Sequence, residues 1–87
     1  MTPDMSIAGD SKSELEWLGQ RIVAARARRH FTQVELSEAA GISRPSLSKI
    51  ERGLVDVGFT RLGRIARALG MDVGTLLAGV DQDRGLK

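Results

Sequence analysis

The sequence predicts a single all-α domain of five short helices. Apolar residues recur at spacings of three and four along most of the chain, glycines follow these runs at short intervals, and no segment shows the strict alternation of a half-buried strand. The 87 residues suffice for one small domain. Because a domain of this size buries only about 60% of the surface of its unfolded chain, each helix has to contribute an apolar face.

The first helix is expected to start at Ser11 or Ser13. Each serine has a glutamate three residues later, which is the capping-box pattern. The preceding segment mixes Pro, Gly, Ser and Asp without a period, so residues 1–12 are expected to form a flexible arm. Cations at residues 28–30 suit the negative end of the helix dipole. The expected inward face consists of Leu15, Leu18, Ile22 and Ala25.

The middle of the chain predicts two short helices joined by a tight turn. Thr32 is a candidate N-cap with Glu35 as its capping-box partner, and Gly41 can end that helix in the left-handed conformation. Ser43 then caps a helix that Gly53 ends. A turn of three or four residues that contains glycine sets two helices at a steep angle, so that the second can lie in the major groove of DNA.

Two further helices are expected after a loop. Apolar residues return at helical spacing over residues 59–69, and Gly70 ends that run. Asp72 is a candidate cap for a last short helix. The folded domain is therefore expected to span residues 13–79, with a flexible tail over residues 80–87.

Composition argues against several classes of function. The chain has no cysteine and one histidine, His30, so no thiolate or multi-histidine metal site is expected. No paired nucleophile and base, metal cluster or phosphate loop occurs, so we expect neither an enzyme nor a bound cofactor. No apolar run approaches the roughly 18 residues of a membrane span, and no secretion signal is evident. The expected location is the cytoplasm, at the nucleoid when bound to DNA.

Basic charge is concentrated in the centre of the chain. Residues 21–70 hold ten Lys or Arg side chains against four acidic ones, a net charge of +6, whereas residues 1–20 have a net charge of −3. Nine of the ten are arginine, whose planar fork makes two parallel hydrogen bonds with a phosphate or a guanine edge. This distribution favours a nucleic-acid partner, and the alternative is an ordinary solvated helix face.

Several short motifs follow one another in a fixed order along the chain. They are Leu18-Gly19-Gln20-Arg21-Ile22, Arg26, Thr32-Gln33, Leu36, Gly41-Ile42-Ser43, Leu47 to Gly53, and Ala66 to Gly70. Over about residues 15–78, this pattern resembles the phage Cro and repressor-like (XRE-type) helix-turn-helix family. The resemblance implies a lambda-repressor-like fold with the helix-turn-helix motif at the second and third helices, and double-stranded DNA as the partner.

The helix over about residues 43–52 is expected to enter the major groove. Leu47 and Ile50 face inward, so the 3.6-residue period turns the candidate base-reading residues outward. These residues are Arg44, Pro45, Ser48 and Lys49. Arginine and lysine suit the O6 and N7 atoms of guanine, whereas proline offers only apolar contact, for instance to a thymine methyl group.

A second set of residues is expected to bind phosphate. It consists of Gln33, Ser43, Ser46, Arg52 and Arg61. Gln33 stands at the start of a helix, where side chain and free backbone amides can together hold a phosphate. For the two serines, helix capping is the alternative role.

Other positions are given structural roles by the resemblance. Arg26 and Glu51 match positions that form a partly buried ion pair in relatives, and His30 replaces the usual glycine after the first helix, where a left-handed cap is expected. Residues 57–58 replace a proline-serine pair, which leaves the following helix without a side-chain cap. Trp17 is expected to cover the edge of the core together with the N-terminal arm, or else to be an exposed anchor for a partner.

Two functions remain open at this point. The favoured one is a sequence-specific transcriptional regulator, a repressor that binds an inverted-repeat operator as a homodimer, with half-sites about 34 Å apart. Residues 73–80 are the candidate dimer contact, by resemblance to phage repressor domains. The alternative is an antitoxin or adaptor that mainly binds a protein, such as a kinase-type toxin, and binds DNA for autoregulation.

Overall fold

Five helices make up the computed structural model, which describes the backbone of residues 3–78 and the side chains from residue 12 onward. They are α1 (Pro3–Arg28), α2 (Gln33–Ala40), α3 (Arg44–Glu51), α4 (Phe59–Ala68) and α5 (Val73–Leu77). The described part of the chain contains no strand. This confirms the all-α fold class with five helices.

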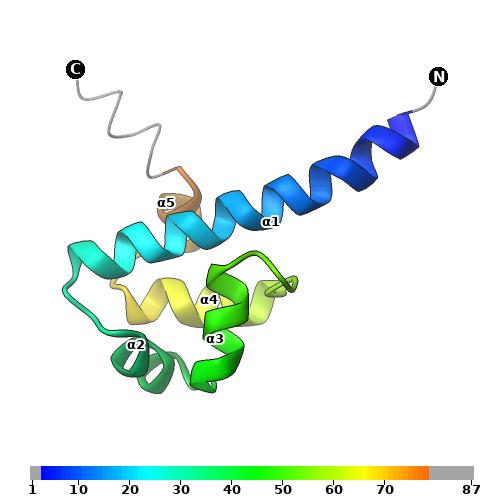
Figure 1. Cartoon of the computed structure of the whole chain (residues 1–87). Helices are drawn as coiled ribbons and strands as arrows, with labels where there is room; N and C mark the ends of the chain where they lie inside the picture. Colours follow the sequence, from blue (N-terminus) through cyan, green and yellow to red (C-terminus); the bar gives the residue numbers. More distant parts are fainter. Residues whose placement is uncertain (1–2, 79–87) are drawn as a thin grey trace.

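The helices pack in a layered arrangement around α1. In Figure 1, α1 runs across one side of α2, α3 and α4, and its N-terminal part extends beyond them. α3 contacts α1 and α2, α2 also contacts α4, and α5 contacts both α1 and α4. α3 is therefore held from two sides, by α1 and by α2.

The start of the first helix differs from the sequence-based expectation. α1 begins at Pro3, so Ser11 and Ser13 lie inside it and the supposed arm is helical over residues 3–12. Proline fits the first turn of a helix because its missing amide would have no partner there. The arm continues the helix that carries Trp17 and so does not fold back over this side chain, which is 45% exposed. The expected tail over residues 80–87 lies outside the described residues.

A single apolar cluster draws on all five helices. Most apolar residues at helical spacing in α2, α3 and α4 are buried, but Phe59, at the start of α4, is 79% exposed and lies outside the core. On α1, the expected inward residues Leu15 and Leu18 are only partly buried, and Leu18 packs against the cluster. Burial of each large aliphatic side chain contributes about 1.5 to 3 kcal/mol. The largest fully buried side chains are Ile22, Leu36, Leu47, Ile65 and Leu69.

Local caps define where the short helices begin and end. The hydroxyl of Thr32 accepts from the amide of Glu35 at 3.0 Å, and the Glu35 carboxylate accepts from the amide of Thr32 at 2.9 Å. His30 adopts a left-handed φ of 59°, as expected for a residue that replaces a capping glycine. Gly58 begins α4 without a side-chain cap, which was also expected.

α1 and α3 cross at a glycine. A Cβ atom added to Gly19 would collide with the backbone carbonyl oxygens of Glu51 and Ile50. The absence of a side chain therefore lets the two helix backbones approach closely, which is one general use of glycine in proteins. This contact fixes the C-terminal end of α3 against α1.

We expect Gly19→Ala to destabilise the domain, because α1 and α3 would have to separate. Overpacking of this kind costs about 1 to 3 kcal/mol, which outweighs the roughly 1 kcal/mol that alanine gains over glycine in a helix. Urea denaturation measures the change in the free energy of unfolding. Gly74→Ala is the matched control, since its added Cβ atom would make only an ordinary contact with Asp72 at 3.6 Å. Equal stability of the two variants would contradict a tight crossing.

Candidate nucleic-acid interface

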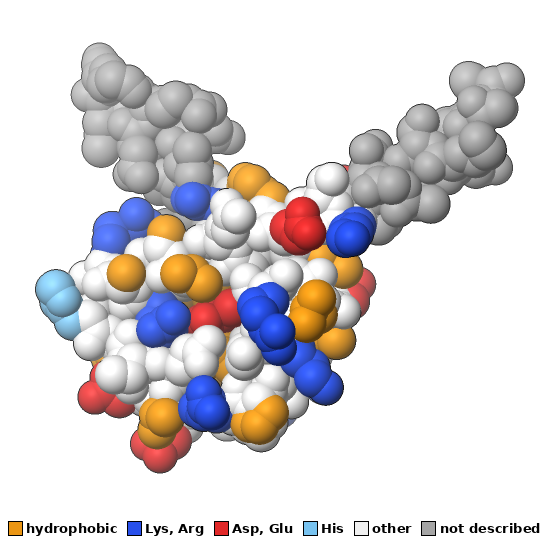
Figure 2. Space-filling model, in the orientation of Figure 1, with side chains coloured by type: hydrophobic (Ala, Val, Ile, Leu, Met, Phe, Trp, Pro, Cys, Tyr) orange, Lys and Arg blue, Asp and Glu red, His pale blue; other side chains and the backbone are white. Residues whose placement is uncertain are grey.

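α3 has one buried side and one exposed side. Leu47 and Ile50 are buried in the core. The candidate base-reading residues lie on the other side: Arg44, Pro45 and Lys49 are exposed and Ser48 is half-buried. In Figure 2, Lys and Arg side chains are spread over the face that carries α3, with most of the visible acidic side chains toward its margins.

The N-terminal end of α3 is closed by two serines. The hydroxyl of Ser43 accepts from the amide of Ser46 at 3.2 Å and donates to the Ser46 hydroxyl at 2.9 Å. Ser43 therefore has the capping role that was one of its two alternatives, whereas the Ser46 side chain only accepts a hydrogen bond from this cap. Pro45 lies in the first turn, where no intrahelical bond to its nitrogen is needed. The helix thus begins at a defined residue and presents Arg44 at its exposed start.

The C-terminal end of α3 is held by an ion pair. Nε of Arg26 lies 2.8 Å from Oε2 of Glu51, and a second guanidinium nitrogen donates to Oε1 at 3.2 Å. Arg26 also donates to the carbonyl oxygen of Phe31 at 3.0 Å. Side-chain exposure is 19% for Arg26 and 3% for Glu51. The predicted pair is present, and it links α1 to the last residue of α3.

Gln33 connects this ion pair to the exposed face of α3. Its Nε2 donates to Oε1 of Glu51 at 2.8 Å, and its Oε1 accepts from a guanidinium nitrogen of Arg44 at 3.2 Å. Sequence reasoning treated Gln33, Arg44 and Glu51 as three separate functions and missed this connection. Gln33 begins α2 and Arg44 begins α3, so the sequence does indicate that both lie at the starts of neighbouring helices. It does not show that they touch, because their contact depends on the angle at which the two helices cross.

The remaining phosphate candidates are exposed and lie on separate elements. Arg52 directly follows α3 and forms its C-terminal cap through its backbone, while Arg61 lies on the first turns of α4. Both side chains are therefore accessible to a ligand. Among the described residues, no group of His, Cys, Asp or Glu could hold a metal ion. No helix in this part of the chain is long and apolar enough to cross a bilayer.

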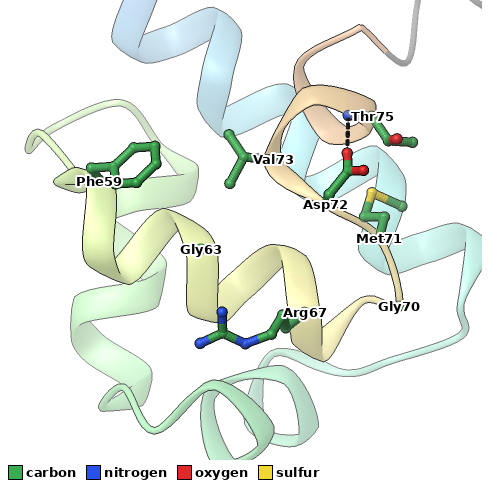
Figure 3. Close-up of a pocket in the computed structure, with 8 residues that line it drawn as sticks. All are labelled: Phe59, Gly63, Arg67, Gly70, Met71, Asp72, Val73 and Thr75. Atoms are coloured by element: carbon green, nitrogen blue, oxygen red, sulfur yellow. Dashed lines mark hydrogen bonds between the residues drawn. The ribbon is translucent and has the colours of Figure 1, made fainter.

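A groove lies between α4 and α5. The sequence predicted a dimer contact over residues 73–80 but gave no indication of a groove. The groove has a volume of about 760 Å³ and is lined in part by Phe59, Gly63, Met71 and Val73, as Figure 3 shows. Phe59 stands at one end of the groove and is 79% exposed. The candidate dimer segment reaches the groove through Val73 and Thr75, whereas its last two residues lie outside the described part. An aromatic side chain this exposed on a small domain is a candidate contact for a partner.

The groove is bounded by the cap of α5. The Asp72 carboxylate accepts from the amide of Thr75 at 2.7 Å, the bond drawn as a dashed line in Figure 3. Hydrogen bonds from the backbone and side chain of Thr75 lower the pKa of Asp72 below its usual value. The carboxylate therefore remains charged at neutral pH, and α5 keeps its cap there.

Removal of one partner from the ion pair should destabilise the domain strongly. Glu51→Leu strands the Arg26 charge and leaves the Gln33 amide without its acceptor, and such a loss costs about 3 to 5 kcal/mol. Urea denaturation of the single variants and of the double variant Arg26→Met/Glu51→Leu measures the effect. We expect the double variant to be more stable than Glu51→Leu. A double variant that is less stable than Glu51→Leu would show that the pair does not neutralise a buried charge.

Comparison with known proteins places the chain in a family. The family model HTH_3, described as helix-turn-helix, matches residues 22–76. The immunity repressor protein of Bacillus phage phi105 is 42% identical over 60 residues, which covers 69% of this chain and 42% of the repressor. The chain spans less than half the length of the curated relatives it matches.

Two solved structures share the fold. The restriction-modification controller protein C.AhdI from Aeromonas hydrophila has a TM-score of 0.72 at 26% identity, covering 74% of this chain and 97% of that one. The clp gene regulator ClgR from Corynebacterium glutamicum has a TM-score of 0.71 at 33% identity, covering 83% and 94%.

The matched region includes α2 and α3, two short helices joined by a tight turn, which is the arrangement that the family description names. The family and its repressor relative also confirm the prediction that the chain is not an enzyme. Since the family model matches more than half of the chain, this protein belongs to the helix-turn-helix family of DNA-binding transcriptional regulators.

Proposed function

We propose that this protein binds double-stranded DNA sequence-specifically, with α3 in the major groove, and acts as a repressor. The observation that carries the proposal is that α3 has a serine cap at one end, an ion pair at the other and four candidate base-reading residues on its exposed side. A rigid helix with an exposed polar side is the element that a major groove admits. The similarity to a phage immunity repressor supports the repressor role.

The proposal includes a homodimer, because one recognition helix reads only a few base pairs. In a two-fold dimer the same patch serves both subunits, so a protruding side chain can enter a groove on its partner and accept the partner's side chain in return. Phe59 and the groove beside it, with Val73 on its wall, provide both halves of such a contact. The occupant we assign to this groove is therefore a second copy of the chain.

An antitoxin or adaptor role remains the alternative. The exposure of Trp17 on α1 favours it, because tryptophan is enriched where proteins bind one another. Both functions include binding of DNA, so duplex binding does not separate them. Co-purification with a protein encoded next to this one separates them, because only the antitoxin or adaptor requires such a partner.

Arg44→Ala should change which sequences are preferred. Loss of a bidentate contact to guanine costs about 1 to 3 kcal/mol on the best site, with little effect on random DNA. Arg52→Ala is the matched control, and we expect it to weaken binding to all sequences alike. The measurement is fluorescence anisotropy titration of duplexes selected from a random pool, at several salt concentrations. Affinity that does not fall with salt would contradict phosphate binding, since log K should drop with a slope of about −0.9 per neutralised phosphate.

Phe59→Ser should weaken self-association without unfolding the domain, because this side chain is 79% exposed in the single chain. Sedimentation equilibrium over a range of concentrations measures the dimer dissociation constant. Truncation of a central interface aromatic costs 2 kcal/mol or more, so we expect that constant to rise by about 30-fold. Val34→Ser is the matched control, since Val34 is 47% exposed but lies on α2, outside the groove lining. Equal effects of the two changes would rule out the groove as the dimer contact.

A further inference from the structure

The groove between α4 and α5 contains one charge of each sign. Among the described residues that line it, Arg67 is the one cation and Asp72 the one anion. Arg67 lies in the last turn of α4, and Asp72 is the residue that caps α5 (Figure 3). Both side chains are exposed in the single chain. The groove therefore offers two opposite charges next to its apolar lining.

These two charges do not pair with each other inside one chain. Within the described part of the chain, the one ion pair joins Arg26 to Glu51. Arg67 thus has no acidic partner there, although it is exposed. Asp72 accepts a hydrogen bond from the amide of Thr75, but a carboxylate has about four acceptor sites on its two oxygens, so it can also accept a guanidinium.

A contact that covers Phe59 would remove water from the same groove. A charge that loses its water without gaining a partner costs free energy, and removal of water from the guanidinium of Arg67 is therefore unfavourable unless a carboxylate meets it. The fork of an arginine fits a carboxylate through two parallel hydrogen bonds. A partner that covers the groove must therefore bring a carboxylate to Arg67 and a cation to Asp72.

A second copy of the chain meets both requirements at once. In a two-fold contact, one residue of the first copy meets a different residue of the second, and the reverse contact forms as well. A patch with one arginine and one aspartate can thus form two pairs of unlike charge. A register that brought Arg67 opposite Arg67 would instead be opposed by like-charge repulsion, which is how charges select one docking arrangement.

We propose that Arg67 of one protomer forms an ion pair with Asp72 of the partner subunit, twice in each dimer, and that these pairs fix the register of the dimer. This inference rests on the proposed function, in which the groove is the dimer contact. Phe59 then supplies apolar area, and the two charges determine which copy arrangement is stable.

The test compares two variants with two matched controls. Arg67→Met removes the cation, and Asp72→Asn removes the negative charge while keeping an oxygen that can cap α5, since asparagine and aspartate cap helices equally well. The controls are Arg64→Met and Glu38→Gln, because Arg64 and Glu38 line a separate hollow between α2 and α4 and not the groove. Sedimentation equilibrium measures the dimer dissociation constant, and thermal unfolding shows that each variant is folded.

We expect the dissociation constant to rise by about tenfold or more for Arg67→Met and for Asp72→Asn, because each change leaves two charges of the dimer unpaired. Both controls should retain the dissociation constant of the wild-type protein.

A mixture of the two variants shows whether the pair joins different chains. A dimer of one Arg67→Met chain and one Asp72→Asn chain has one intact ion pair and one pair of neutral side chains, so no charge is stranded. Each variant alone can form only dimers with two stranded charges. The equimolar mixture should therefore contain more dimer than either variant alone at the same total concentration. A role of these residues within one chain would give no such gain.

Two results would overturn the ion pair: a mixture that associates no more than the separate variants, and an effect of Arg64→Met as large as that of Arg67→Met. Loss of association in Phe59→Ser without any loss in Arg67→Met would also refute the pair, while leaving the groove as the dimer contact. A wild-type protein that stays monomeric at all concentrations, or that associates as well after Phe59→Ser, would refute the proposed homodimer itself. The two failures are therefore distinguishable.

Discussion

The carboxylate of Glu51 is the group on which the presentation of α3 depends. It is almost completely buried at the end of that helix, and burial of an unpaired charge would cost several kcal/mol. Arg26 supplies the opposite charge from α1, and Gln33 adds a third hydrogen bond from α2. One buried group thus ties together the three helices that have to keep a fixed geometry if α3 is to fit a groove of constant width.

The close approach of the helix backbones makes this pairing possible. Gly19 allows α1 to touch the carbonyl groups at the end of α3, so Arg26, two turns further along α1, can reach the carboxylate. At the other end, the serine cap fixes where α3 begins. The apolar contacts of Leu47 and Ile50 set which side of the helix faces inward. Backbone contact, cap and core packing therefore position α3 jointly.

Sequence reasoning recovered the features that depend on neighbouring residues. The starts of α2, α3 and α5 were predictable because a capping side chain lies within three residues of the amide it binds. The start of α1 was not, because a capping-box pattern can also occur inside a longer helix, as at Ser11 and Ser13. The link from Gln33 to Arg44 was missed because these residues are 11 positions apart and meet only through the crossing of α2 and α3. Family resemblance supplied the Arg26–Glu51 pair for the same reason: no local pattern joins residues 25 positions apart.

Burial decreases along the connected side chains from Glu51 through Gln33 to Arg44. The inner bonds to Glu51 involve a charge shielded from water, and water competes poorly for them. The outer bond between Gln33 and Arg44 is exposed, and a bond of that kind is worth only about 0.5 to 1.5 kcal/mol net. A base edge can therefore adjust the direction of Arg44 at small cost, while the inner bonds keep Gln33 in place. The same arrangement that gives the free protein a preferred orientation leaves its outermost side chain able to adapt to DNA.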